Sequence, residues 1–189
     1  FSVTRQVVVG DIALLRAEGH SITATPRGYM IPAETGLRRT IASGRFTVTA
    51  DTAFAEVVAA CATASGRREQ GTWITPEMRR AYVRLHELGY AHAVECWQQD
   101  ELVGGLYGVC LDRMFFGESM FSRVTDASKV ALAALVDQAL RLGIGAIDCQ
   151  MTTAHLLRFG ARELDRPAFQ ALLDESIDRC RPQKKWRLP

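Results

Sequence analysis

The order of predicted elements between residues 75 and 151 constrains the fold more than any other feature of this sequence. Three apolar segments suited to strands are predicted over residues 93–99, 102–111 and 114–121, and a turn at Asp100-Glu101 joins the first two. A strongly periodic helix follows over residues 128–142, and then a short apolar strand over residues 146–151. Antiparallel strands that lead through a helix into another strand are typical of a layered α+β domain, with helices packed on a mixed sheet.

Further helices are predicted ahead of and behind this block. The clearest start is Thr75-Pro76-Glu77, where an N-cap hydroxyl, a proline in the first turn and an acid near the positive helix end occur together. That helix is expected to end at Leu88, before Gly89. Other helices are predicted over residues 36–45, over the alanine-rich residues 54–62, and over residues 167–177.

The first 32 residues have a pattern of their own. Apolar positions recur at helical spacing between residues 4 and 17, and Gly19 follows as a stop. Two short extended pieces, residues 22–25 and 29–31, flank the turn signal Pro26-Arg27-Gly28. A short helix and a wing-like hairpin are therefore expected ahead of the main domain.

Composition excludes several classes of protein. A chain of 189 residues that is 48% hydrophobic suits one sizeable core with a small appendage. The formal net charge of +2 is too low for a protein that coats nucleic acid, so RNA contacts must come from local patches. The five cysteines form no CxxC pair, so neither zinc nor a disulfide framework is expected. No apolar run has the roughly 18 residues of a membrane span. A cytoplasmic protein without a membrane partner is expected.

Three polar side chains interrupt the predicted strands: Glu118, Asp148 and Gln150. Burying such groups without partners is unfavourable, so each is either paired or functional. Residues two apart on a strand share a face, so Asp148 and Gln150 are expected side by side, with Cys149 pointing away. From the residues alone, a satisfied ion pair is the commoner explanation for a carboxylate in a strand, and catalysis is the alternative.

Around these residues the sequence resembles the leucyl/phenylalanyl-tRNA protein transferases. The motifs include Phe-Gly-Glu-Ser-Met-Phe-Ser-Arg at residues 116–123 and Ile-Asp-Cys-Gln at residues 147–150. Further stretches match at residues 71–74, 82–89, 94–97, 102–109 and 127–129, in the family's order and spacing over residues 37–173. The resemblance implies an N-acetyltransferase-like fold over residues 33–189 that uses aminoacyl-tRNA where relatives of that fold use acyl-CoA.

The resemblance also implies an activity. Leucine, phenylalanine or methionine would pass from aminoacyl-tRNA to the amine of an acceptor protein that begins with Arg or Lys, which tags the acceptor for degradation under the N-end rule. No cofactor is implied, because an aminoacyl ester is already activated and an α-amine with a pKa of about 8 is partly neutral. By family analogy Asp148 orients the amine or accepts its proton, Gln150 holds the reacting groups, and Glu118 supplies negative charge for a cationic acceptor. In the alternative mechanism the tRNA ribose hydroxyl shuttles the proton and Asp148 only orients.

The donor side chain is expected in an apolar pocket. The positions that match the family's pocket are Leu106, Phe115, Leu132, Leu135, Ala139 and Ile147, although an apolar helix face is commonly plain core. Trp73 and Trp97 are candidates to stack on the terminal adenosine, with packing as the alternative. Candidate contacts to the acceptor-stem phosphates, on what is otherwise a solvated basic face, are Arg38, Arg39, Arg45, Arg67 and Arg68.

Residues 1–32 have a second resemblance. They are similar to the recognition helix and wing of a helix-turn-helix repressor of NAD biosynthesis, in which Thr4, Arg5 and Gln6 would open the helix that enters the major groove. The supporting helices of such a module do not precede them, so DNA is not expected as a partner. Two rival functions stay open: a DNA-binding regulator whose larger domain senses a ligand, and an inactive transferase-like scaffold that binds tRNA.

Overall fold

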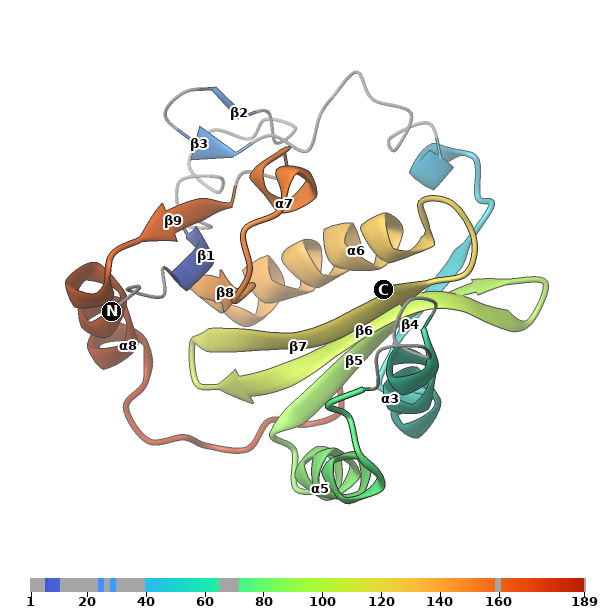
Figure 1. Ribbon diagram of the computed structural model, residues 1–189, viewed down its shortest axis with the longest axis horizontal. Coiled ribbons are helices and arrows are strands. Elements are labelled where there is room, and N and C mark those ends of the chain that lie inside the picture. Colours follow the sequence, from blue (N-terminus) through green and yellow to red (C-terminus); the bar gives the residue numbers. More distant parts are fainter. Residues whose placement is uncertain are drawn as a thin grey trace.

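The computed structural model describes residues 6–10, 24–25, 28–29, 40–64, 72–158 and 161–188. Within these residues a mixed sheet of seven strands has the order β4-β5-β6-β7-β8-β1-β9. Helices cover both faces of this sheet, with α6 on one side and α3 and α5 on the other (Figure 1). The predicted α+β class is thus confirmed.

Strands β4 to β7 form an antiparallel meander, and β7 then pairs in parallel with β8 through Met114, Phe115 and Phe116. The strand β8 ends at Asp148, whereas β7 continues to Ser122. Pairing between the two strands therefore ends at Phe116. The bounds are β1 Gln6–Gly10, β4 Thr47–Ala50, β5 Ala91–Gln98, β6 Glu101–Leu111, β7 Met114–Ser122, β8 Ala146–Asp148 and β9 Arg162–Leu164.

Local signals account for the helix ends. Thr75 Oγ1 accepts a hydrogen bond from Met78 N at 3.3 Å at the start of α5, and Asp165 caps α8 by accepting from Ala168 N at 2.9 Å. The helix α6 ends at Gly143, whose φ of 72° lies in the left-handed region that glycine adopts without strain. The bounds are α3 Phe54–Thr63, α5 Pro76–Glu87, α6 Ala127–Leu142, α7 Ala154–Arg158 and α8 Arg166–Ser176.

The apolar run of β6 follows from burial of the sheet on both faces. Leu106 packs in the cluster under α6, whereas its neighbour Tyr107 packs in the cluster under α3 and α5. Between Tyr107 and Gly108 the pairing with β7 shifts by one residue. A Cβ atom at Gly108 would collide with the carbonyl oxygen of Phe116, so this register requires glycine.

Most expected elements are confirmed, and the N-terminal helix is not. Residues 6–10 form the strand β1, which pairs antiparallel with β8 and β9. The reason is composition: Val7, Val8 and Val9 are β-branched and favour a strand, and the sheet supplies partners on both sides. The rest of that predicted helix lies outside the described residues.

The predicted hairpin around Pro26 is present in part, because Ala24–Thr25 (β2) pairs antiparallel with Gly28–Tyr29 (β3). The division into residues 1–32 and 33–189 stays a prediction, although β1 belongs to the main sheet. Among the described residues, no helix is both long enough and apolar enough to cross a bilayer.

Candidate active site

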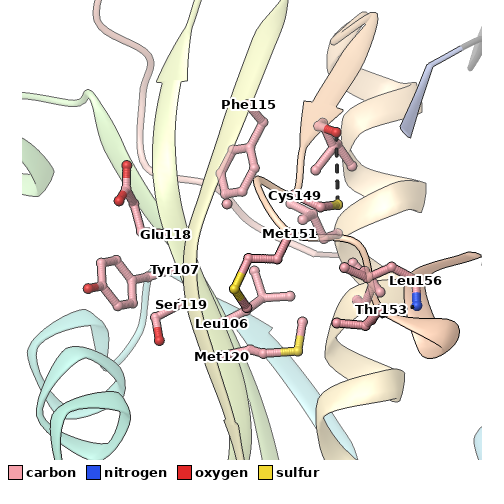
Figure 2. Close-up of a pocket in the computed structure, with 14 residues that line it drawn as sticks. Leu106, Tyr107, Phe115, Glu118, Ser119, Met120, Cys149, Met151, Thr153 and Leu156 are labelled. Atoms are coloured by element: carbon pink, nitrogen blue, oxygen red, sulfur yellow. Dashed lines mark hydrogen bonds between the residues drawn. The ribbon is translucent and has the colours of Figure 1, made fainter. Parts of the chain in front are cut away.

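A pocket of about 170 Å³ opens where β7 and β8 separate, between these strands and α6. Five of the six positions expected to hold the donor side chain line it: Leu106, Phe115, Leu132, Leu135 and Ile147. Figure 2 shows Phe115, Met120 and Met151 on one side of β7, and Tyr107, Glu118 and Ser119 on the other. The pocket therefore combines an apolar chamber with a polar side that contains a carboxylate.

Glu118 owes its orientation to a β-bulge. Tyr107 pairs with Ser119 and Gly108 pairs with Gly117, so Glu118 is the extra residue on β7 that has no opposite partner on β6. A bulge of this kind turns a side chain away from the alternation of the strand. The Glu118 carboxylate reaches Tyr82 of α5, whose hydroxyl donates a hydrogen bond of 2.8 Å to Oε2.

The neighbours of Glu118 have opposite effects on the pKa of its carboxyl group. Burial raises the pKa of the Glu118 carboxyl and the hydrogen bond from Tyr82 lowers it, while the charge of Asp148 raises it. Burial also raises the pKa of Tyr82, so its hydroxyl stays protonated as a donor. The Tyr82 ring packs edge-on against Tyr107, with ring centroids 5.0 Å apart, and against Trp73.

Asp148 is 1% exposed and lies at the end of β8, opposite Phe116. Its Oδ1 accepts a hydrogen bond of 2.9 Å from the backbone N–H of Gln150. Gln150 has a φ of 61°, and the next residue, Met151, donates its N–H to Cys149 O at 2.7 Å. A left-handed residue other than glycine is unfavourable, so the Asp148 carboxylate stabilises a tight turn beside the pocket.

This turn corrects one expectation. Asp148 and Gln150 do not lie side by side on a strand, because β8 ends at Asp148 and Gln150 is exposed on the turn that follows. A strand prediction from apolar pattern cannot detect a positive φ at glutamine, a residue that rarely adopts it. Neither side chain is part of the pocket wall.

Two other expected binding residues also lie off the wall. Ala139 is fully buried in the core under α6, one turn beyond Leu135. Trp73 is 47% exposed and contacts Tyr82, so it lies next to the polar side of the site. Their roles in binding stay predictions.

Trp97 is not part of the pocket wall, and it packs against the core cluster under α3 and α5. Its indole N–H donates to Thr49 Oγ1 at 2.8 Å, and Thr49 donates to the buried carboxylate of Glu95 at 2.6 Å. Of the arginines expected at tRNA phosphates, Arg45 lies over the Phe46 ring. Arg38, Arg39, Arg67 and Arg68 lie outside the described residues.

Several residues of the site were not expected from the sequence. Tyr82 occurs as an ordinary apolar-face residue of α5, and its contact with Glu118 joins positions 36 apart in the chain. Regular strand alternation would place Met120 and Phe115 on opposite faces, because they are five residues apart, and the bulge at Glu118 brings them to the same side. The pocket wall also includes Ser119, Cys149, Met151, Thr153 and Leu156.

The arrangement suits a ligand that has both an apolar side chain and a polar group. An apolar side chain fits the chamber, and a cationic or proton-donating group fits beside Glu118 on the pocket wall. Burial raises the pKa of Cys149 to about 12, so this thiol on the wall is a neutral apolar surface and not a nucleophile at neutral pH. Within the described residues, no group of three or more His, Cys, Asp and Glu side chains is placed to hold a metal ion.

Comparison with known proteins assigns the chain to a family. A family model described as leucyl/phenylalanyl-tRNA protein transferase matches residues 28–174. The protein of that name from Aromatoleum aromaticum is 60% identical over 152 residues, which cover 77% of this chain and 63% of the relative. The one from Syntrophobacter fumaroxidans is 53% identical over 165 residues, 85% of this chain and 70% of the relative. The chain thus spans between 63% and 70% of the length of these relatives, and it belongs to the leucyl/phenylalanyl-tRNA protein transferase family.

Proposed function

We propose that the chain transfers leucine, phenylalanine or methionine from aminoacyl-tRNA to the N-terminal amine of an acceptor protein. One observation carries the proposal: in a member of this family, an apolar pocket lies next to the two carboxylates Glu118 and Asp148. The pocket takes the donor side chain, and the carboxylates face the amine that attacks.

The lining of the pocket supports a choice among apolar donors. Leu106, Leu132 and Leu135 offer no hydrogen-bond partner, so a polar group held against this part of the wall would lose its hydration without compensation. The thioethers of Met120 and Met151 are flexible and polarisable, which suits both a branched and an aromatic side chain. Leucine, phenylalanine and methionine meet these requirements.

The acceptor amine needs positioning and removal of a proton. Its nitrogen attacks the ester carbonyl carbon, a C–N bond forms, and the C–O bond to the tRNA ribose breaks. The proton of the amine ends on the ribose oxygen, either directly or by way of the Asp148 carboxylate. Glu118, held by Tyr82, supplies a negative charge for the side chain of an N-terminal Arg or Lys.

The partners follow from this chemistry. The tRNA acceptor stem would contact exposed basic side chains, for which Arg45 is a candidate. Because charged tRNA is a cytoplasmic substrate, we place the reaction in the cytoplasm. The acceptor is a protein that begins with Arg or Lys, and transfer would mark that protein for degradation.

The test is a transfer assay with defined substrates. The protein is incubated with tRNA that carries labelled Leu, Phe, Met or Asp, and with peptides that begin with Arg, Lys or Asp. Label is expected on the Arg and Lys peptides from the three apolar donors, and not on an Arg peptide whose α-amine is acetylated. Retention of tRNA without transfer would favour the inactive scaffold instead. Binding of a specific duplex DNA without transfer would favour the regulator.

A further inference from the structure

The chain after α8 runs back along the sheet as a strap, residues 178–188, seen in red in Figure 1. Its first anchor is Asp112, in the turn between β6 and β7. Asp112 Oδ2 accepts hydrogen bonds of 2.8 Å from the backbone N–H groups of Asp178, Arg179 and Cys180, and Oδ1 accepts one of 3.1 Å from Arg181. One carboxylate therefore fixes the start of the strap.

A second anchor lies nearer the end of the strap. Gln183 N–H donates to Gly89 O at 2.7 Å, and the Gln183 side chain donates to Asp112 O at 3.3 Å. Its amide oxygen accepts the indole N–H of Trp186 at 2.9 Å. Gln183 thus ties Trp186 to the end of the sheet where β5 begins and β6 ends.

Trp186 is the buried residue of the strap, with 3% of its surface exposed. Its backbone N–H donates to Asp51 Oδ2 at 2.7 Å, and its ring stacks flat on His92 with centroids 4.3 Å apart. The same Asp51 oxygen lies 2.7 Å from His92 Nδ1. These contacts hold both the backbone and the ring of Trp186.

The Trp186 indole also contacts Phe115. The two ring centroids are 5.6 Å apart at an interplanar angle of 36°. Phe115 is fully buried and is also part of the pocket wall. Phe115 therefore contacts both the pocket and Trp186, whereas Trp186, which stacks on His92, is not part of the pocket wall.

We propose that Trp186 is a positioning residue that sets the depth of the donor pocket by holding Phe115 in place. The inference rests on the proposed function, because it assigns that pocket to the donor side chain. Protein cores are close-packed, so the Phe115 ring can retreat only if space opens behind it. With Trp186 in place the pocket stops at Phe115, and without it the pocket deepens toward His92. A segment remote from the pocket in sequence would thus limit the size of the donor.

The test compares donors in Trp186 variants. We measure kcat/KM for leucyl, methionyl, phenylalanyl and tryptophanyl donors with wild type, Trp186→Ala and Trp186→Phe. Trp186→Ala is expected to favour the two aromatic donors over leucine by about ten-fold relative to wild type, as for other changes of pocket size. Trp186→Phe keeps a ring against Phe115, and its donor ratio is expected to stay within about two-fold of wild type.

Added indole supplies the rescue experiment. The space left in Trp186→Ala is apolar and shaped for an indole ring, so millimolar indole should restore the wild-type donor ratio. Leu102→Ala is the matched control, because Leu102 is buried in the cluster on the opposite face of the sheet. It is expected to lower stability without changing the donor ratio. If Trp186→Ala does not fold, Trp186→Leu takes its place, with a shift expected in the same direction.

The outcomes separate this inference from the proposed function. An unchanged donor ratio in Trp186→Ala, or an equal change in Leu102→Ala, would overturn the role of Trp186 while transfer itself stands. If wild type transfers no donor, the proposed function fails. Binding of N-acetyl-phenylalaninamide and N-acetyl-leucinamide, measured by calorimetry on the same variants, then tests pocket depth without transfer. The same shift toward the aromatic ligand supports the inference, and its absence overturns it.

Discussion

The Tyr82 hydroxyl donates a hydrogen bond of 2.8 Å to the Glu118 carboxylate and so joins helix α5 to the bulge of β7. Burial raises the pKa of Glu118, the Tyr82 hydrogen bond lowers it, and the nearby charge of Asp148 raises it. Tyr82 is thus the neighbour that favours the charged form. If Glu118 receives a cationic acceptor, its ionisation limits activity at low pH.

Replacing Tyr82 by Phe is therefore expected to move the acidic limb of the pH–rate profile to higher pH. The variant loses the hydrogen bond that lowers the pKa of Glu118, while burial and Asp148 still raise it. The measurement is kcat/KM with an Arg-starting peptide between pH 5 and 8. Tyr90→Phe is the control, since the Tyr90 backbone lies opposite Cys110 and the groups that act on the Glu118 carboxyl are Tyr82 and Asp148, so the limb should stay in place. A limb that stays in place in Tyr82→Phe would mean that Glu118 ionisation does not govern the reaction.

The charge of Glu118 is expected to select the charge of the acceptor. Wild type should prefer a peptide that begins with Arg over one that begins with citrulline, its neutral analogue, because only Arg forms an ion pair with Glu118. Glu118→Gln should reduce that preference by about ten-fold or more, as expected when a charge-assisted hydrogen bond is lost. Competition between the two peptides in one reaction measures the ratio. An equal preference in wild type and variant would place the acceptor side chain elsewhere.

The pocket and the core of α6 are expected to respond differently to truncation. Leu132 and Val130 are both buried on α6, but Leu132 lines the pocket and Val130 does not. Leu132→Ala removes wall and should favour phenylalanyl over leucyl donors, in addition to a loss of about 2–5 kcal/mol in stability. Val130→Ala should cost stability alone. Donor ratios and thermal midpoints of both variants decide whether this face of α6 contacts the donor.

The elements that were predicted correctly carry local signals. Thr75 is the N-cap of α5 and Pro76 is its first residue, and Gly143 follows the last residue of α6, so local sequence indicates these helix ends. The strands β5, β6 and β7 follow one another through short turns, so their pairing needs no distant information. Five of the six expected pocket residues could also be predicted, because the resemblance to the family and the periodicity of the helix indicate them.

The features that escaped prediction depend on contacts distant in sequence. The pattern predicts a helix where β1 lies because Val7 and Val8 fit a helical spacing with Ala13, Leu14 and Leu15, and only pairing with β8 and β9 favours a strand. The short elements β4, α7 and β9 were not predicted, since three to five residues carry too little periodicity. The bulge at Glu118 and the burial of Trp186 likewise depend on partners that the sequence does not indicate.

Asp112 is expected to stabilise the strap in a pH-dependent manner. Four backbone N–H groups donate to its carboxylate and lower the pKa of Asp112 below the ordinary value of 3.8. A carboxyl whose pKa is lowered on folding adds stability above its unfolded pKa, and that stability is lost as the pH falls through the folded pKa. Asp112→Asn should therefore have a lower thermal midpoint than wild type at pH 7. The difference in thermal midpoint between Asp112→Asn and wild type should become smaller below about pH 4, where the Asp112 carboxyl of the unfolded chain begins to be protonated.

The control for this prediction is Asp178→Asn. Asp178 forms an exposed ion pair with the Arg179 side chain at 3.2 Å, a contact that contributes little to stability. Its thermal midpoint should stay near that of wild type across the same pH range. If the difference in thermal midpoint between Asp112→Asn and wild type does not change with pH, the charge of the Asp112 carboxylate does not contribute to stability.

The most direct test of the proposed activity is the rate of leucine transfer from charged tRNA to an Arg-starting peptide, measured for wild type and for Asp148→Asn. The asparagine keeps an oxygen that can accept the N–H of Gln150, so the turn after β8 is preserved while the charge is lost. We expect transfer by wild type, and in Asp148→Asn a rate lower by roughly a hundred-fold or more at an unchanged thermal midpoint, in the range for a positioned acid–base group. A wild-type protein that transfers no leucine under these conditions, or an Asp148→Asn variant as fast as wild type, would contradict the account.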